Sequence, residues 1–292
     1  RLADAVRRAP AARIDEYSTD GRRHDTRQAL HDAAHQRRAT LGDRPGACYA
    51  PRSIMIESPH TRIAPLLPPD VVSVECDPAA GDPTPDALRA ALHPAERALV
   101  ATAHPKRLRE FTAGRRAARQ ALARLDRGGA PLLAAADRTP CWPPGITGSI
   151  THSGRYCAVA VAPSAAIAAL GIDAETRPGI ERELWDGILT ASERAWLEEM
   201  PAARQVPLAR LLFTAKECTY KCQHALTGRF LGFQEVSIRL ADDLGRFEAE
   251  IRSDRAAPLR RGDRLAGRCL LADDLALAAM ALTPAAADRL GR

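Results

Sequence analysis

The chain lacks any apolar run long enough to cross a membrane and has no cysteine pair spaced as CxxC. A transmembrane helix needs roughly 20 consecutive apolar residues, and the longest apolar runs here, such as 275–282, are far shorter. No segment has the order of charged, apolar and small residues that marks a secretory signal. The seven cysteines are odd in number. Together these features predict a cytoplasmic protein with reduced thiols and without a membrane span.

Cys218 and Cys222 are the two cysteines whose spacing needs an explanation, because residues four apart share one face of a helix. Two such thiols can pack into a core or serve as a pair of metal ligands. No further cluster of ligands accompanies them. Packing is therefore the favoured interpretation, and metal binding stays the alternative.

Lysine is also scarce. Of the 42 lysine and arginine residues only three are lysine, namely Lys106, Lys216 and Lys221. Such a bias towards arginine is typical of a GC-rich genome. A lysine near a metal and phosphates can act as a compact charge or release a proton, which arginine cannot do at usable pH. The three lysines are therefore candidates for sites that need this chemistry, with chance as the alternative.

Positive charge is concentrated at the start of the chain. Residues 1–54 hold eleven arginines, no lysine and seven acidic residues, which accounts for four of the six net positive charges. The rest of the chain has too little excess charge to predict a nucleic-acid surface. Met55 opens a new segment. We therefore expect the compact protein to begin near Met55 and residues 1–54 to be a flexible extension or upstream sequence.

Strand and helix patterns fill two stretches of similar size, 55–165 and 166–292. In the first, we expect strands at 71–76 and 156–162 and helices from Pro85, from His93 and over 106–122. In the second, we expect a strand ending at Glu175, helices at 180–188, from Thr190 and at 213–224, and strands at 233–240, 247–251 and 268–282. Thr190 and Glu193 have the spacing of a capping box, which predicts the helix start at Thr190. These patterns predict an α/β (α+β) fold with two halves and a site between them.

Acidic side chains gather in two short motifs of the second half. In a strand, Asp173 and Glu175 share a face about 7 Å apart, because side chains alternate with a period of two. On a helix, Glu217 and Lys221 project together, because residues i and i+4 share a face. Three carboxylates with a lysine beside them suit a hard divalent cation bound to a phosphate ester.

Basic and hydroxyl side chains gather in the first half. Arg107 and Arg115 lie two turns apart on the predicted helix at 106–122. This spacing alone is also typical of a solvated helix face. Ser149 and His152 stand before the buried strand at 156–162, and beside arginines they are suitable phosphate ligands. A lone histidine would more often be structural.

Four stretches of the sequence together resemble the 4′-phosphopantetheinyl transferases, specifically the monomeric, double-length class that activates siderophore, nonribosomal-peptide and polyketide synthases. They are 106–122 (KR…EF…GR.AAR.AL), 142–160 (WP.G..GS.THS), 171–175 (GIDAE) and 213–221 (FTAKE…K). The last is followed by LTGR.LGF from residue 226. Each stretch is weak alone, but all four occur in the family's order between about residues 55 and 282. Residues 1–54 have no counterpart in the family pattern.

The resemblance implies two pseudo-twofold-related α/β halves with coenzyme A in the cleft between them. It implies transfer of the 4′-phosphopantetheine arm from coenzyme A to a serine of an apo acyl, peptidyl or aryl carrier protein, with release of 3′,5′-ADP. The family further implies a monomer that depends on Mg²⁺, with Mn²⁺ as an alternative ion. Which carrier or pathway is served is left open.

Site residues follow by matching positions of the family motifs. Asp173, Glu175 and Glu217 are the implied Mg²⁺ ligands, so Asp173 is also catalytic through the metal. Glu217, or a water that it positions, is the candidate base for the incoming serine. Lys221 is the candidate acid or charge stabiliser for the leaving phosphate. The implied coenzyme contacts are Arg107, Arg115, Arg138, Ser149, His152, Lys216 and Lys221.

The chain departs from the family pattern at two neighbouring positions. Cys218 stands where Ser or Ala is usual, and Thr219 where the class often has an aromatic residue, which leaves carrier preference in doubt. Two other classes of function remain as alternatives. One is a Mg²⁺-dependent phosphodiesterase or nuclease built on the same acids. The other is a binding protein, either an arginine-rich nucleic-acid module or a catalytically inactive carrier-binding relative.

Overall fold

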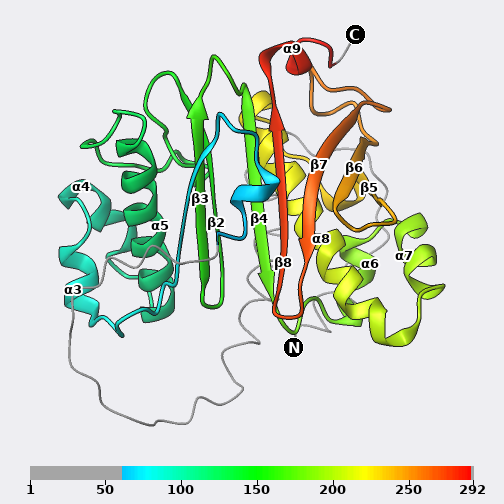
Figure 1. The fold of residues 1–292 in the computed structure, drawn as a ribbon, viewed down its shortest axis with the longest axis horizontal. Coiled ribbons are helices and arrows are strands. Elements are labelled where there is room, and N and C mark those ends of the chain that lie inside the picture. The colour runs from blue at the N-terminus through cyan, green and yellow to red at the C-terminus, as the bar shows by residue number, and fades with distance from the viewer. Residues whose placement is uncertain (1–60, 291–292) are drawn as a thin grey trace, which may run out of the picture.

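The computed structural model describes residues 61–290, which form two antiparallel β-sheets lying side by side, each with a long helix on one face (Figure 1). The predicted start at Met55 and the predicted extension over residues 1–54 lie outside the described residues. Within residues 61–290, none of the helices combines the length and apolar character that crossing a bilayer requires. The arrangement confirms the predicted α+β class.

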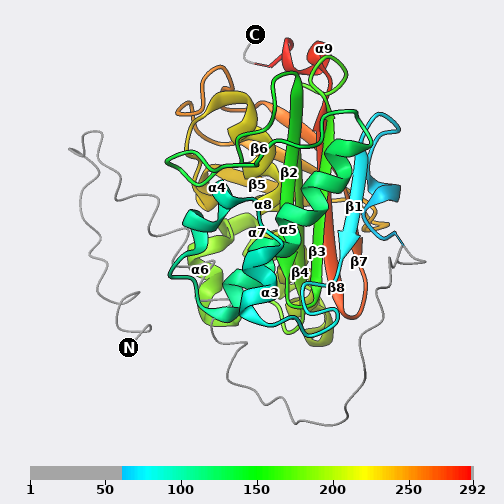
Figure 2. The ribbon, with the colours of Figure 1, turned by 90° about the vertical axis from the view of Figure 1, so that its left-hand side faces the viewer.

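The first half holds a three-stranded sheet in the order β1-β3-β2, and α5 lies across it (Figure 2). Its elements are β1 (Val72–Cys76), α3 (Pro85–Ala90), α4 (Pro94–Arg97), α5 (Pro105–Ala123), β2 (Ile146–Ser153) and β3 (Tyr156–Pro163), with single 3-10 turns at Ala64–Leu66 and Ala98–Val100. Every strand and helix predicted for this half is present. The stretch around Ser149 forms a further strand, β2, which was not predicted from the sequence.

The second half holds a five-stranded sheet in the order β4-β8-β7-β6-β5. Its helices are α6 (Trp185–Ile188), α7 (Ala191–Glu198), α8 (Ala202–Thr227) and α9 (Pro284–Ala287), with 3-10 turns at Arg182–Leu184 and Phe233–Glu235. Its strands are β4 (Ala169–Thr176), β5 (Val236–Leu240), β6 (Arg246–Ile251), β7 (Arg264–Leu271) and β8 (Leu275–Leu282). The capping box predicted at Thr190 is confirmed, since Glu193 N donates to Thr190 Oγ1 and Thr190 N donates to Glu193 Oε2.

Helix α8 begins well before the predicted residue 213 and includes Pro207. Proline has no amide hydrogen and normally ends a helical pattern. Here Pro207 lies near the amino-terminal end, where few hydrogen bonds are lost. The turns before it are mostly exposed and show no apolar face.

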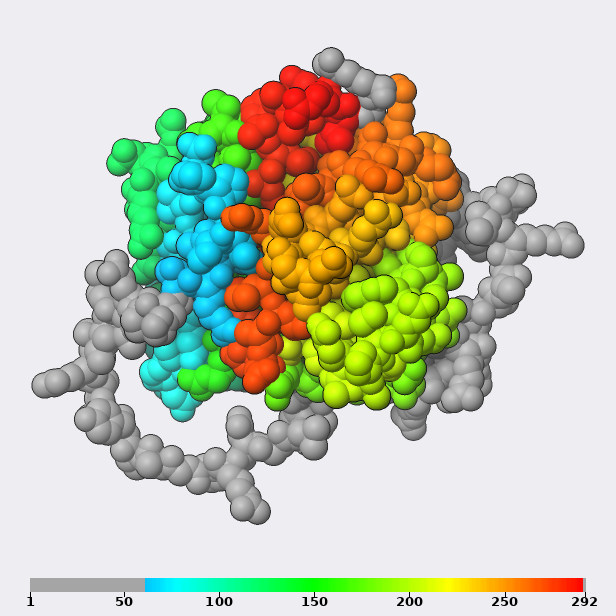
Figure 3. Space-filling view, turned by 45° about the vertical axis from the view of Figure 1, so that its right-hand side comes forward, coloured from blue at the N-terminus to red at the C-terminus, as the bar shows by residue number. Residues whose placement is uncertain are grey.

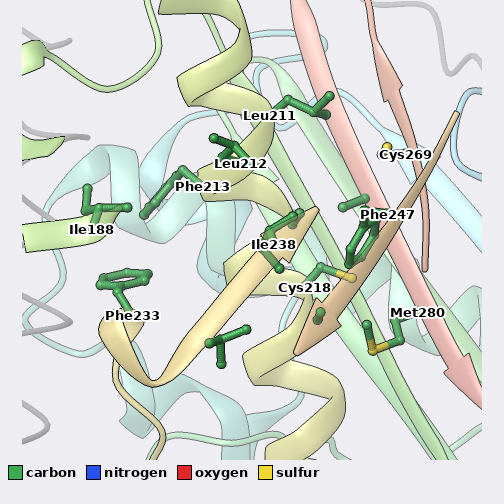
Figure 4. Close-up of a cluster of buried hydrophobic side chains, with 14 of the residues drawn as sticks. Ile188, Leu211, Leu212, Phe213, Cys218, Phe233, Ile238, Phe247, Cys269 and Met280 are labelled. Atoms are coloured by element: carbon green, nitrogen blue, oxygen red, sulfur yellow. The ribbon is translucent and has the colours of Figure 1, made fainter. Parts of the chain in front are cut away.

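The largest hydrophobic cluster lies between α8 and the five-stranded sheet (Figure 4). Phe213 of α8 packs against Phe233, with ring centroids 5.6 Å apart. Cys218 and Cys222 are both fully buried here, and Cys218 Sγ donates to Gly171 O. The two cysteines therefore pack into the core, as the sequence favoured. Burial of this face holds α8 in a fixed position over β4.

The two sheets meet at β2 and β4, which are edge strands of different sheets. No backbone ladder joins them. Instead, three hydroxyl groups of β2 accept hydrogen bonds from three backbone N–H groups of β4, pairing Ser149 with Ile172, Thr151 with Ala174 and Ser153 with Thr176. The donor–acceptor distances are 3.0–3.1 Å. The hydroxyl groups of β2 thus give hydrogen-bond partners to N–H groups at the edge of the second sheet that would otherwise be buried without one.

The segment before β1 crosses from the first half to the second. Arg62 makes two hydrogen bonds to Asp274 on the β7–β8 turn, at 2.8 and 2.9 Å, and Arg268 Nη1 donates to Pro65 O. Figure 3 shows this segment, in blue, against the orange and red strands of the second half. A shallow groove of about 440 Å³ lies at this seam, lined by 66–69 and by β7 and β8. It faces away from Asp173, since its lining residue Ala279 pairs with Ile172 and alternates with Ala278, the partner of Asp173.

Candidate functional site

Gly171 allows α8 to approach β4 closely enough to bring the predicted acids together. A Cβ atom at this position would lie 2.2 Å from Cys218 O and 2.7 Å from Cys222 N, so only glycine fits. Two residues further along the same face of β4 lies Asp173, and one helical turn from Cys218 lies Lys221. The close approach at Gly171 is therefore a condition for the contact between Asp173 and α8.

Asp173 is the centre of this cluster and is only 1% exposed. Its Oδ1 accepts hydrogen bonds from Lys221 Nζ at 2.7 Å and from Thr151 Oγ1 at 3.1 Å. Its Oδ2 is buried and has no hydrogen-bond partner among residues 61–290. Burial raises the pKa of Asp173, the Lys221 ammonium lowers it, and the carboxylates of Glu175 and Glu217 raise it, so that the pKa is about 6.

Glu175 and Glu217 complete the predicted acidic set. Both are almost fully buried, at 3% and 5% exposure. Ser153 Oγ donates to Glu175 Oε2 at 3.2 Å. Glu217 interacts electrostatically with both Asp173 and Lys221. The structure therefore brings the three predicted carboxylates and Lys221 into one buried cluster at the junction of the two sheets.

Lys221 connects the two halves. Its Nζ donates to Asp173 Oδ1, to Ile172 O of β4 at 3.2 Å and to Ile150 O of β2 at 3.3 Å. An ammonium group has three donors, and here each has an acceptor. Burial lowers the pKa of Lys221, but the adjacent Asp173 and Glu217 carboxylates outweigh this and hold it above its usual value. Lys221 is thus a firmly held positive charge rather than a ready proton donor.

The cluster has the donor chemistry that a hard divalent cation needs. Three buried carboxylates lie in one cluster with a single ammonium, and the unpartnered oxygen of Asp173 is a strong acceptor in a low-dielectric setting. Within residues 61–290, no three acidic, cysteine or histidine side chains are already closed into a metal cage. The residues therefore fit a cation by charge and ligand type, and coordination requires their side chains to draw together.

Lys216 lies outside this acidic cluster. Its position does not support the phosphate contact predicted for it. Its Nζ is 2.9 Å from Glu193 Oε2 and donates to Phe233 O and Val236 O, at 2.8 and 2.6 Å. The side chains of Lys216 and Glu193 are 1% and 2% exposed. The physical reason is helix geometry: at about 100° per residue, Lys216 points roughly 140° away from Lys221.

Helix α5 brings a set of cations to the other side of β2. Arg107, Phe111 and Arg115 follow one another at one-turn intervals, and both guanidinium groups lie near the Phe111 ring, at 5.8 and 4.3 Å from its centroid. Arg115 is buried, and its Nε has no hydrogen-bond partner among the described residues. Burial lowers the pKa of Arg115, Glu96 raises it and Arg107 lowers it, so that the pKa is about 10. A buried cation with a spare donor suits an anionic ligand.

His152 of β2 faces this basic set. Its Nε2 lies 3.1 Å from Arg107 Nη1, and its Nδ1 lies 3.6 Å from Glu110 Oε2. Lys106 Nζ lies 3.9 Å from the other oxygen of Glu110. The structure therefore brings His152, Arg107 and Arg115 to one side of the junction. Sequence reasoning missed Glu110, although its position inside the 106–122 motif was a signal.

Two other predicted coenzyme contacts, Ser149 and Arg138, do not lie in this basic set. Ser149 is buried, and its hydroxyl accepts the N–H of Ile172, so it joins the sheets and is not directed at a ligand. Arg138 is exposed on the loop before β2, in a left-handed backbone conformation with φ of 67°. The preceding Asp137 accepts from Thr139 and lies 3.4 Å from His224 Nε2 of α8. The structure thus fixes the loop but shows no side-chain contact for Arg138 itself.

Comparison with known proteins places both halves in one family. Residues 95–162 match the 4′-phosphopantetheinyl transferase N-terminal domain, and residues 169–280 match the 4′-phosphopantetheinyl transferase superfamily. The chain is 38% identical over 224 residues to the 4′-phosphopantetheinyl transferase Svp of Streptomyces mobaraensis, covering 75% of this chain and 89% of Svp.

Two further relatives are similar at the same level. Identity to the 4′-phosphopantetheinyl transferase Npt of Nocardia iowensis is 38% over 209 residues, covering 68% of this chain and 91% of Npt. Identity to the 4′-phosphopantetheinyl transferase PptT of Mycobacterium tuberculosis is 39% over 169 residues, covering 55% of this chain and 72% of PptT.

Proposed function

The chain belongs to the 4′-phosphopantetheinyl transferase superfamily, and we propose that the junction between its two sheets is the centre at which it acts. It is a transferase that moves the 4′-phosphopantetheine arm to carrier proteins. The observation that carries the proposed location is the convergence of Asp173 and Glu175 from β4 with Glu217 and Lys221 from α8.

Coenzyme A is the proposed donor of the arm, and α5 with His152 is its proposed anion site. Arg107, Arg115 and His152 lie together beside β2, and the spare donor of Arg115 supports a phosphate ligand there. Arg138 is a weaker candidate, supported by its place on the adjoining loop. We do not extend this role to Lys216 or Ser149, because both have structural partners.

Mg²⁺ is the proposed metal, with Asp173, Glu175 and Glu217 as its ligands and Mn²⁺ as an alternative ion. When bound, the ion would neutralise charge on the pyrophosphate and favour its departure. Strand β2 connects the metal ligands to the anion site, since Ile150 contacts Lys221 and His152 contacts Arg107. Because residues two apart on a strand are about 7 Å apart, the proposed pyrophosphate site and the proposed phosphate site are neighbours along β2.

The proposed reaction forms a bond from the carrier serine oxygen to the phosphorus of the pantetheine arm and breaks the bond to 3′,5′-ADP. Glu217, or a water it positions, is the proposed acceptor of the serine proton. Lys221 is the proposed charge stabiliser for the leaving group, since its raised pKa and three acceptors keep its proton in place. Thr151 holds Asp173 from the β2 side.

The proposed partners are apo acyl, peptidyl or aryl carrier domains of siderophore, nonribosomal-peptide or polyketide synthases. We further propose that the protein acts as a monomer, because both halves of the junction come from one chain. The cytoplasm is the proposed compartment, as the place where coenzyme A and carrier proteins meet. Nucleic acid is not among the proposed partners.

Intact-protein mass spectrometry tests this function. An apo peptidyl carrier domain is incubated with the full chain, coenzyme A and Mg²⁺. We expect the carrier to gain the mass of one phosphopantetheine arm and to lose this gain when a chelator is present. Absence of a gain on peptidyl, acyl and aryl carriers, with folded protein, would contradict the proposal.

A further inference from the structure

The hydrogen bond between Arg107 and His152 fixes where the proton of the imidazole lies. The Nη1 of Arg107 is 3.1 Å from His152 Nε2. A guanidinium group can only donate, so Nε2 must accept. The ring proton is therefore on Nδ1, which faces Glu110 Oε2 at 3.6 Å. In this state His152 is neutral, and the lone pair of Nε2 points at the anion site.

This neutral form cannot bind a phosphate through Nε2, because two electron pairs would face each other. A proton gained at Nε2 converts the atom from an acceptor into a charged donor. Glu110 is suited to stabilise that imidazolium through Nδ1–H, since its side chain is only 11% exposed. Arg107 would then be released from Nε2 and could donate to the same anion.

The charges around His152 explain why the ligand is needed for this change. Lys106 and Arg107 on α5 oppose a further positive charge, whereas Glu110 favours it. Other titratable groups on the elements packed against β2 include Arg115 on α5, Tyr156 and Cys157 on β3, Asp173 and Glu175 on β4, and Glu217 and Lys221 on α8. An arriving phosphate adds negative charge directly at Nε2 and so shifts the balance towards the imidazolium.

We propose that binding of coenzyme A takes up one proton at His152 Nε2 and that Glu110 is the positioning residue for this step. The inference rests on the proposed coenzyme site. It assigns to Glu110 a role in setting the ring orientation and its protonation, without direct contact to the substrate. Coenzyme affinity should therefore fall as the pH rises, by up to about tenfold per pH unit, the limit for one linked proton.

Isothermal titration calorimetry of the full chain with coenzyme A tests the proposal. Titrations at pH 8 in two buffers with different protonation enthalpies give the number of protons taken up. At this pH a free imidazole is neutral and the terminal phosphate is a dianion, since their pKa values are about 6.5 and about 6. We expect an uptake approaching one proton for the wild type and none for His152→Asn.

Two further variants separate the role of Glu110 from a general effect of charge. For Glu110→Gln, we expect a smaller uptake and an affinity loss that is greater at pH 8 than at pH 6.5. Glu199→Gln, at an exposed position of α7's end, should behave as the wild type. Thermal unfolding confirms that each variant is folded. Because His152→Asn tests the same proton, the test does not depend on the folding of the Glu110 variant.

The outcomes are distinct. Binding of coenzyme A without proton uptake by the wild type, or an unchanged uptake in His152→Asn or Glu110→Gln, would overturn the inference and leave the proposed function standing. Failure of the folded wild type both to bind coenzyme A and to modify a carrier would overturn the proposed function, and the inference with it.

Discussion

The two long helices bring opposite charges to the junction between the sheets. Helix α5 carries Arg107 and Arg115, and Arg115 retains an unused donor. Helix α8 and β4 together contribute three carboxylates and the single ammonium of Lys221, which contacts Asp173. One half is thus prepared for an anion and the other for a cation. Substitutions in the two halves should therefore affect different kinetic constants.

The largest expected effect comes from Asp173→Ala. Removing the central acid takes away the buried oxygen that suits a cation and leaves Lys221 without its shortest contact. We expect a loss of about a thousandfold or more in kcat, with little change in the KM for coenzyme A. Steady-state transfer to a carrier measures both constants. Asp242→Ala, on an exposed turn, is the matched control, and near-normal transfer by Asp173→Ala at low Mg²⁺ would refute the ligand role.

Lys221→Arg should have the next largest effect. The variant keeps the charge, but a planar guanidinium cannot reproduce three contacts to Asp173 Oδ1, Ile150 O and Ile172 O. We expect kcat to fall by about a hundredfold and coenzyme binding to be nearly kept. Single-turnover transfer measures the chemical step. An unchanged turnover number would remove Lys221 from the proposed mechanism.

Arg115→Gln should act on binding instead. The substitution removes the buried cation of α5 while keeping a polar side chain of similar length. Loss of a charged hydrogen bond of about 1.5–3 kcal/mol corresponds to a KM for coenzyme A raised by about 10–100-fold. We expect kcat at saturating coenzyme A to change little. A fall in kcat without a change in KM would show that Arg115 acts in the chemical step. It would contradict the assignment of coenzyme binding to the first half and of the chemical step to the second.

Lys216→Met should have the smallest effect on transfer and a large one on stability. It leaves Glu193 buried without its ammonium partner, which typically costs about 3–5 kcal/mol in the free energy of unfolding. Activity per folded molecule should stay near that of the wild type. Urea unfolding gives the stability, and active-site titration gives the folded fraction. A large loss of kcat in the folded fraction would instead support the phosphate contact that the sequence predicted for Lys216.

Much of this arrangement could be predicted from the sequence. Alternation along a strand placed Asp173 and Glu175 on one face, and helix spacing placed Glu217 beside Lys221. The same rules, applied further, separate Lys216 from Lys221 by helix angle and Ser149 from His152 by strand parity. The family motifs contain Lys216 and Ser149 beside the site residues, and 149–153 has no clear strand pattern in the sequence, so the resemblance assigns both residues to the site.

Other features depend on tertiary contacts that no local pattern reveals. The hydroxyl groups of β2 pair with the N–H groups of β4 only because two sheet edges from different halves meet. The partner of Lys216 is Glu193, which the sequence showed as part of a capping box on α7. A buried carboxylate can cap a helix and also pair with an ammonium group. Only the packing of α7 against α8 makes Lys216 the partner of Glu193.

Calorimetry of coenzyme A binding without metal most directly tests whether the first half binds the coenzyme and the second half carries the chemical step. It measures binding separately from the reaction. The wild type, Asp173→Ala and Arg115→Gln are compared in one series. We predict that Asp173→Ala binds coenzyme A about as tightly as the wild type, whereas Arg115→Gln binds it about 10–100-fold more weakly. Loss of binding in Asp173→Ala together with normal binding in Arg115→Gln would contradict the account.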